Sequence, residues 1–114
     1  MTNTFYVEIL PSDRKIQRFP LPTEQMLVGR SRSRCQLVLT DPRVSRIHLR
    51  IIRSPDLGIT ITDMHSANGS FLDGHLLPSG MAITWLIDQM VSIGSTQLTL
   101  RYGNMPDLPP EASA

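Results

Sequence analysis

The chain has 114 residues, of which 40% are hydrophobic and 18% are charged, and its formal net charge is +1. These values fit one soluble globular domain, and they argue against a membrane-spanning chain and a generally basic nucleic-acid binder. The single cysteine, Cys35, cannot form an internal disulfide, and the first residues do not resemble a secretory signal. We therefore expect a cytoplasmic protein whose fold is held together by packing.

Apolar residues recur at every second position along much of the chain, which is the period of a half-buried β-strand. The pattern predicts strands, in chain order, at residues 5–9, 26–28, 36–39, 47–53, 59–62, 91–93 and 98–102. Asp73-Gly74 is a hairpin-turn signal, and no segment has a convincing amphipathic helix pattern. Many short strands with turn residues between them predict an all-β antiparallel sandwich or a small barrel.

Residues 1–104 are assigned to this domain, and residues 105–114 to a C-terminal linker or tail without a structural pattern. The tail suggests that the chain is one part of a longer multidomain protein. Just before the last two strands, Trp85, Leu86 and Ile87 form an apolar run. We expect this run to pack in the core, and the alternative is a surface for a partner or a second copy.

The positive charge is concentrated between Arg30 and Arg53. This segment holds seven arginines and a single acid, Asp41, although the whole chain is nearly neutral. A local cluster of arginines on a near-neutral protein indicates a bounded anionic ligand. The alternative for any one of these arginines is an ordinary solvated surface position.

Three polar clusters interrupt the apolar strands. They are Gly29-Arg30-Ser31, Ser45-Arg46-Ile47-His48 and the Asp-Met-His-Ser-Ala-Asn-Gly-Ser run at residues 63–70. Each lies at the end of a predicted strand, where a rigid sheet can position a loop. In their order and spacing, these Gly-Arg, Ser-x-x-His and Asp-x-x-Ser-x-Asn-Gly-Ser motifs resemble the forkhead-associated (FHA) domain family, over about residues 26–102.

The resemblance implies an antiparallel β-sandwich of the FHA/SMAD-like type with about eleven strands. It also implies a non-enzymatic module that recognises phosphothreonine in a partner protein or peptide and mediates phosphorylation-dependent interactions in signalling. Neither a cofactor nor a metal is implied, and His65, His75 and Cys35 lack the spacing of zinc ligands. Nucleic acid and membranes are not expected as partners.

The resemblance also assigns roles to individual residues of this chain. Phosphate contacts are assigned at Arg30, Ser45, Arg46 and Ala67, and the peptide-backbone contact at Asn68. Arg43 stands where family members read a side chain a few residues after the phosphothreonine, and an arginine favours an acid there. The residues that shape the loops are Gly29, His48, Ser66 and Gly69.

These assignments agree with the chemistry of the ligand. A phosphothreonine carries about −1.5 to −2 charges and three strong acceptor oxygens, so it needs fixed, charge-assisted donors. The chain departs from the family at Ala67, because many members have a threonine there whose hydroxyl helps to bind phosphate. The backbone N–H of Ala67 is the donor that remains at this position.

Three other readings of the sequence stay open. A degenerate site would leave a phosphate-independent interaction or oligomerisation domain. A small basic β-barrel could bind nucleic acid, although the six aromatic residues lie outside the arginine-rich segment. Ser45, His48 and Asp63 are the residue types of a hydrolase triad, but the sequence shows none of the geometry that a triad requires.

Overall fold

The computed structural model describes residues 3–11, 15–22, 24–56 and 58–106, so residues 107–114 of the predicted tail lie outside the described residues. The described residues form eleven strands and no helix, and thus contain no helix that could cross a membrane. The strands are β1 (Thr4–Leu10), β2 (Gln17–Pro20), β3 (Gln25–Gly29), β4 (Leu37–Val38), β5 (Leu49–Ser54), β6 (Gly58–Asp63), β7 (Ser70–Leu72), β8 (His75–Leu76), β9 (Ile83–Thr84), β10 (Met90–Ile93) and β11 (Thr96–Gly103).

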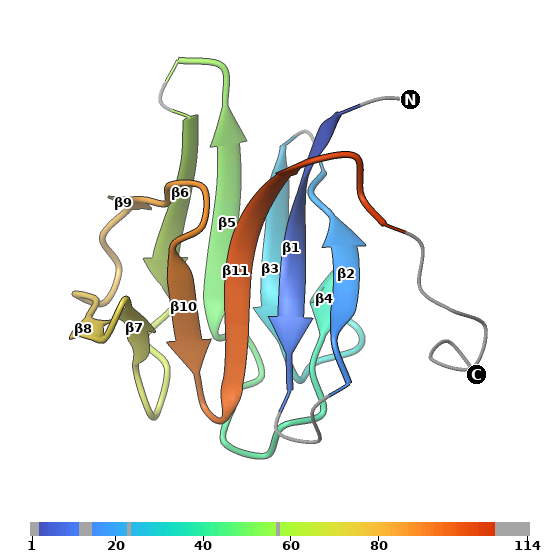
Figure 1. Ribbon diagram of the computed structural model, residues 1–114. Coiled ribbons are helices and arrows are strands. Elements are labelled where there is room, and N and C mark those ends of the chain that lie inside the picture. Colours follow the sequence, from blue (N-terminus) through green and yellow to red (C-terminus); the bar gives the residue numbers. More distant parts are fainter. Residues whose placement is uncertain (1–2, 12–14, 23, 57, 107–114) are drawn as a thin grey trace.

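Two sheets pack face to face (Figure 1). One has six strands in the order β2-β1-β11-β10-β7-β8, and the other has five strands in the order β4-β3-β5-β6-β9. All neighbouring strands run antiparallel except β3 and β4, which run parallel. The prediction of an all-β sandwich is therefore confirmed, and the small barrel is excluded by the two separate sheets.

The strands that the sequence pattern predicted are all present, with bounds shifted by one or two residues at most ends. The clearest difference is at Ile47 and His48, which were expected in a strand but belong, with Ser45 and Arg46, to the loop before β5 begins at Leu49. Their backbone groups have other partners. The carbonyls of Ser45 and Arg46 accept the N–H groups of Arg30 and Ser31, so they are not available to a sheet.

The core lies between the two sheets and consists of the inward-facing members of the alternating strands. Val7, Met26, Ile61 and Leu98 are completely buried there, as the period of two requires. Trp85 also belongs to this core, because it is 2% exposed and its indole Nε1–H donates to the Gln89 carbonyl at 2.9 Å.

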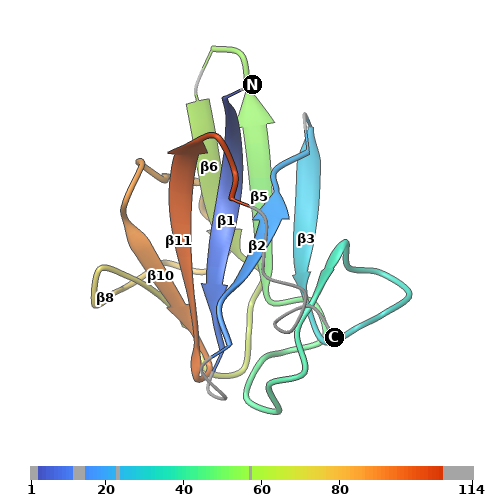
Figure 2. The ribbon, with the colours of Figure 1, turned by 45° about the vertical axis from the view of Figure 1, so that its right-hand side comes forward.

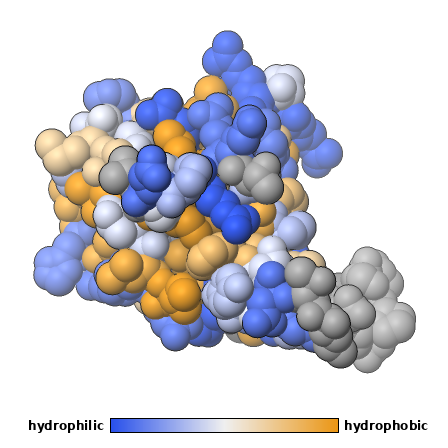
Figure 3. Space-filling view, turned by 90° about the horizontal axis from the view of Figure 1, so that it is seen from above, coloured by the Kyte–Doolittle hydropathy of each residue, from blue (hydrophilic) through white to orange (hydrophobic). Residues whose placement is uncertain are grey.

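The two residues after Trp85 are exposed, so the expected core packing of this run holds only for the tryptophan. Leu86 and Ile87 lie on the surface and line an apolar groove of about 500 Å³, together with Phe5, Ile59 and Leu100. The view from above shows apolar atoms gathered on this end of the sandwich (Figure 3). This end is opposite to the one that carries the loops described below.

Candidate functional site

The three polar clusters meet at one end of the sandwich, at the bottom of Figure 1. β3 and β6 end there and β5 begins there, so the β3–β4, β4–β5 and β6–β7 loops are neighbours. The β10–β11 turn lies at the same end. Figure 2 shows the β3–β4 loop projecting beside the β4–β5 loop.

Arg30 begins the β3–β4 loop and is bonded to the β4–β5 loop through both its backbone and its side chain. Its N–H donates to the Ser45 carbonyl at 3.1 Å, and its Nε–H donates to the Val44 carbonyl. The side chain is exposed, and its two terminal nitrogens donate to no acceptor among the described residues. Anchoring through Nε therefore fixes the guanidinium and leaves its terminal donors for a ligand.

Gly29 allows these two loops to approach each other. A side-chain carbon at this position would lie 2.1 Å from the Arg46 carbonyl oxygen and 2.8 Å from the Ser45 carbonyl oxygen. Both obstacles are backbone atoms, so no rotamer change could relieve the clash. Glycine is thus required here by the close passage of the chain.

Ser45 lies in the β4–β5 loop, where its carbonyl accepts the Arg30 N–H. Its hydroxyl oxygen accepts the Ala67 N–H at 3.0 Å. A hydroxyl has two acceptor lone pairs and one O–H donor, so this bond holds the oxygen in place and keeps the O–H for another acceptor. The bond also joins the β4–β5 loop to the β6–β7 loop.

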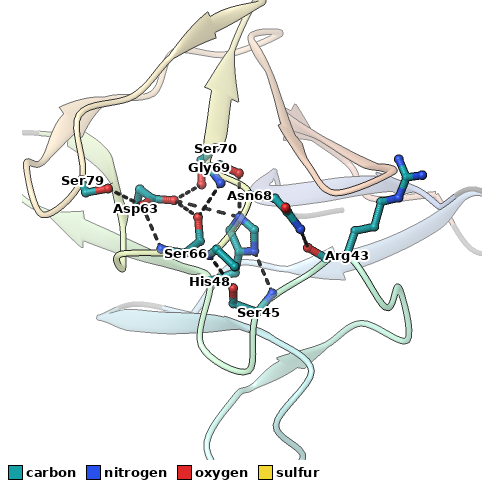
Figure 4. A network of polar contacts seen from close by, with 10 residues as sticks. Arg43, Ser45, His48, Asp63, Ser66, Asn68, Gly69, Ser70 and Ser79 are labelled. Atoms are coloured by element: carbon teal, nitrogen blue, oxygen red, sulfur yellow. Dashed lines mark hydrogen bonds and ion pairs between the residues drawn. The ribbon is translucent and has the colours of Figure 1, made fainter.

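His48 is completely buried beneath these loops (Figure 4). Its Nδ1 accepts the Ser45 N–H at 3.0 Å, and its Nε2 lies 2.9 Å from the Gly69 carbonyl. The first bond needs an unprotonated Nδ1, so the proton resides on Nε2, which donates to Gly69. A neutral imidazole in this tautomer therefore joins the two loops.

The same contacts exclude a triad in the described geometry. A catalytic histidine must face the serine hydroxyl, but His48 faces the Ser45 backbone N–H, and the hydroxyl is bonded to Ala67. Nε2 also lies 4.0 Å from the Asp63 carboxylate, which is beyond hydrogen-bonding distance.

Asp63 ends β6 and organises the β6–β7 loop from inside. Its carboxylate is 1% exposed and accepts the hydroxyls of Ser66 and Ser70 at 2.6 Å each, the Ser79 hydroxyl at 2.9 Å and the Ser66 N–H at 3.1 Å. Burial raises the pKa of Asp63, but the hydrogen bonds from Ser66, Ser70 and Ser79 outweigh it, and the pKa lies below its ordinary value. Asp63 is therefore ionised at neutral pH.

Asn68 and Gly69 are the last two residues of this loop before β7. The Asn68 side chain points toward the β4–β5 loop and donates through Nδ2 to the Arg43 carbonyl at 2.8 Å (Figure 4). Gly69 has a φ of 83°, a conformation that favours glycine. Ser66 accepts the Gly69 N–H at 3.0 Å, so the loop is also bonded within itself.

Asp41 fixes the other side of the site, although the sequence analysis noted it only as the single acid of the arginine-rich segment. Its carboxylate is 8% exposed and accepts the N–H of Arg43 at 2.9 Å, the N–H of Ser95 at 2.7 Å and the Thr96 hydroxyl at 2.9 Å. Burial raises the pKa of Asp41, but these bonds outweigh it and leave the pKa below its ordinary value. Asp41 thereby attaches the β4–β5 loop to the β10–β11 turn.

The arginines that are clustered in the sequence lie at different places in the structure. Arg32 and Arg34 lie in the β3–β4 loop with Arg30, and the β4–β5 loop carries Arg43 and Arg46. Arg53, in contrast, lies near the other end of β5, with its guanidinium 5.0 Å from the centre of the Phe5 ring.

None of the seven arginines between residues 30 and 53 forms an ion pair with a carboxylate of a described residue. The β3–β4 and β4–β5 loops hold five of these arginines against one acid, Asp41, which attracts Arg43 without forming an ion pair, so they carry a net positive charge beside fixed hydroxyl and amide donors. Such a site can hold a dianion on the surface of a sandwich. Within the part of the chain that the structure describes, no group of three or more His, Cys, Asp or Glu side chains could hold a metal ion.

The FHA domain family matches residues 26–94, which is more than half of the chain. The chain belongs to the FHA domain family, and the resemblance seen in the three motifs is confirmed. No curated protein sequence matches the chain.

Solved structures with the same fold include several FHA domains. The FHA domain of the CT664 protein from Chlamydia trachomatis is 28% identical, with a TM-score of 0.77 over 85% of this chain and 95% of that one. The MEK1 FHA domain, solved with a phosphothreonine peptide of HOP1, is 25% identical, with a TM-score of 0.66 over 83% of this chain and 94% of that one. A third structure, from a study of phosphothreonine-dependent FHA domain interactions, is 21% identical, with a TM-score of 0.71 over 90% of this chain and 99% of that one.

Proposed function

We propose that this chain binds a phosphothreonine-containing segment of a partner protein and thereby mediates a phosphorylation-dependent interaction in signalling. One observation carries the proposal. Arg30, Ser45 and Ala67 come from three different loops, and hydrogen bonds between these loops fix them before any ligand arrives. Because the donors need little reordering, more of their interaction with a phosphate contributes to affinity.

In this proposal, Arg30 and Ser45 are the principal phosphate donors. Arg30 supplies the terminal N–H groups of its guanidinium, and Ser45 supplies the O–H that the Ala67 bond leaves available. Arg46 is exposed next to Ser45 and adds positive charge and further donors. The Ala67 N–H, which was expected to contact phosphate, donates instead to Ser45 Oγ, so in this proposal Ala67 contributes by holding Ser45.

Asn68 and Arg43 would contact the rest of the peptide. The Asn68 side-chain oxygen accepts no hydrogen bond from a described residue, so it can accept an N–H of the peptide backbone. The Arg43 guanidinium extends away from the bonded network (Figure 4). At this place it favours an acidic side chain a few residues after the phosphothreonine.

Titration calorimetry with a phosphothreonine peptide and its unphosphorylated copy tests the proposal. The wild type should bind only the phosphorylated peptide, and Arg30→Ala should weaken binding about 10- to 150-fold, because a hydrogen bond to a charged group contributes about 1.5–3 kcal/mol. Arg32→Ala is the matched control, since it removes the same charge from an exposed position in the same loop. Equal losses in the two variants, or binding of the unphosphorylated peptide, would refute the proposed role of Arg30.

A further inference from the structure

An exposed apolar pair adjoins the end of the β6–β7 loop. Phe71 in β7 and Leu76 in β8 face each other across the hairpin as register partners. Leu76 is 65% exposed and Phe71 is 37% exposed. The sandwich does not bury either side chain fully, and neither has a role in the phosphate contacts.

The position of this pair relates it to the proposed peptide site. A side-chain carbon built at Gly69 would lie 2.9 Å from Leu76 Cδ1 and 3.7 Å from Phe71 Cε1. The apolar pair therefore touches the residue that follows Asn68. Asn68 itself donates to the Arg43 carbonyl, so neighbouring residues of this loop meet Arg43 and the apolar pair. A peptide bonded to Asn68 would thus have Arg43 on one side and the apolar pair on the other.

The hairpin that carries the pair is held in place before binding. Asp73 and Gly74 both have positive φ, 47° and 87°, which is the turn type that matches the twist of two antiparallel strands. The Asp73 carboxylate accepts the Met90 N–H at 3.0 Å and the Gln89 side-chain amide at 3.2 Å. The apolar surface is consequently a fixed one, and a ligand would not have to order it.

We propose that Phe71 and Leu76 form a specificity surface for an apolar side chain of the bound phosphopeptide, two residues after the phosphothreonine. Side chains of an extended chain alternate between its two sides. If the third residue points to Arg43, the second points to the opposite side, where the apolar pair lies. The favoured sequence after the phosphothreonine is therefore any residue, then an apolar residue, then an acid. This inference rests on the proposed function.

The bound peptide fits this surface better than a second copy of the chain. A stable interface between proteins buries about 800 Å² on each partner, and two partly exposed side chains offer only a small part of that area. One peptide side chain requires far less surface. The pair is also continuous with the loop that is proposed to hold the peptide backbone, so no separate docking event is needed.

The test compares two phosphothreonine peptides that are identical except for leucine or serine at the second position, both with glutamate at the third. Burying about 50 Å² of apolar surface corresponds to roughly an eightfold gain in affinity for the leucine peptide. Leu76→Ser should reduce this preference to less than about twofold. Leu86→Ser is the matched control, since it is 59% exposed at the opposite end and should keep the preference.

The outcomes separate this inference from the function on which it rests. Phosphate-dependent binding with equal affinity for the two peptides would overturn the inference and leave the proposed function intact. A leucine preference that persists in Leu76→Ser would also overturn it. If neither phosphopeptide binds better than its unphosphorylated copy, the proposed function itself fails. Circular dichroism and the fluorescence of Trp85 verify that each variant is folded.

Discussion

Asp63→Asn should destabilise the fold and weaken phosphopeptide binding, although this residue touches no ligand in the proposed site. The carboxylate is buried and accepts four hydrogen bonds, three from serine hydroxyls and one from a backbone N–H. Asparagine has the same shape but no charge. The serine hydroxyls can turn to accept from the new amide group, so the main loss is the charge assistance.

The size of the effect follows from these four bonds. A hydrogen bond to a charged group contributes about 1.5–3 kcal/mol and a neutral one about 0.5–1.5 kcal/mol, so each bond loses about 1 kcal/mol. Neighbouring bonds are not additive, and we therefore expect a total loss of about 2–4 kcal/mol in the free energy of unfolding. The β6–β7 loop is tied to the sheet by the same bonds, so phosphopeptide affinity should fall as well.

Urea unfolding followed by tryptophan fluorescence measures this loss. Trp85 is the one tryptophan of the chain and is 2% exposed, so its emission reports the opening of the core. Asp88→Asn is a suitable control, because Asp88 is an exposed aspartate whose ion pair with Arg101 is worth at most about 1 kcal/mol. If the free energy of unfolding of Asp63→Asn lies within about 0.5 kcal/mol of the wild-type value, and the variant binds the phosphopeptide equally well, the buried carboxylate does not organise the loop.

Three further predictions concern packing, pH and charge. Gly29→Ala should lower the free energy of unfolding by about 2–3 kcal/mol, because the added carbon meets backbone atoms; an unchanged urea midpoint would mean that the loops can separate. The pKa values of Asp41 and Asp63 lie below the ordinary 3.8, so their stabilisation is present above that value and is lost below it, as the pH falls through the lower pKa of the folded protein. The urea midpoint should therefore begin to drop near about pH 4 and continue to fall at lower pH, less steeply in Asp63→Asn, and a flat profile would contradict the assignment. Single-stranded DNA, titrated at two salt concentrations, should bind weakly, whereas tight binding with a steep salt dependence would favour a nucleic-acid function.

The sequence predicted the long strands and the main site motifs, because both depend on local patterns. Alternation over five or more residues marks a half-buried strand, and the Gly-Arg and Ser-x-x-His motifs lie directly at strand ends. β2, β7, β8 and β9 have two to four residues each and were not recognised from the pattern, whereas the equally short β4 and β10 were recognised from the apolar runs at 36–39 and 91–93. So short a segment does not establish a period, and the inward or outward direction of Phe71 and Leu76 could not be read from it.

The residues that hold the site together were harder to predict because their partners are distant in the sequence. Asp41 accepts hydrogen bonds from Ser95 and Thr96, more than fifty positions away. Nothing near Asp41 in the sequence signals this contact. The Asp63 interactions with Ser66 and Ser70 are closer, and the Asp-x-x-Ser spacing is a signal that could have suggested them.

The arginine cluster was also only partly informative. Residues several positions apart along one strand are far apart in space, since a strand advances about 3.3 Å per residue. β5 has six residues, so Arg53 lies at the opposite end from the loops. Charge counted along the chain therefore overestimates the charge at the site.

The central claim is that donors on the β3–β4 and β4–β5 loops, held in place by the β6–β7 loop, bind one phosphate group together. Titration of ¹⁵N-labelled protein with a phosphothreonine peptide, followed by amide NMR shifts, tests it most directly. The amides of Arg30, Ser45 and Ala67 should shift along a single saturation curve, while those of Leu86 and Ile87 stay in place, and the unphosphorylated peptide should cause no shifts. Shifts confined to the Leu86 end, or equal shifts with both peptides, would contradict the account.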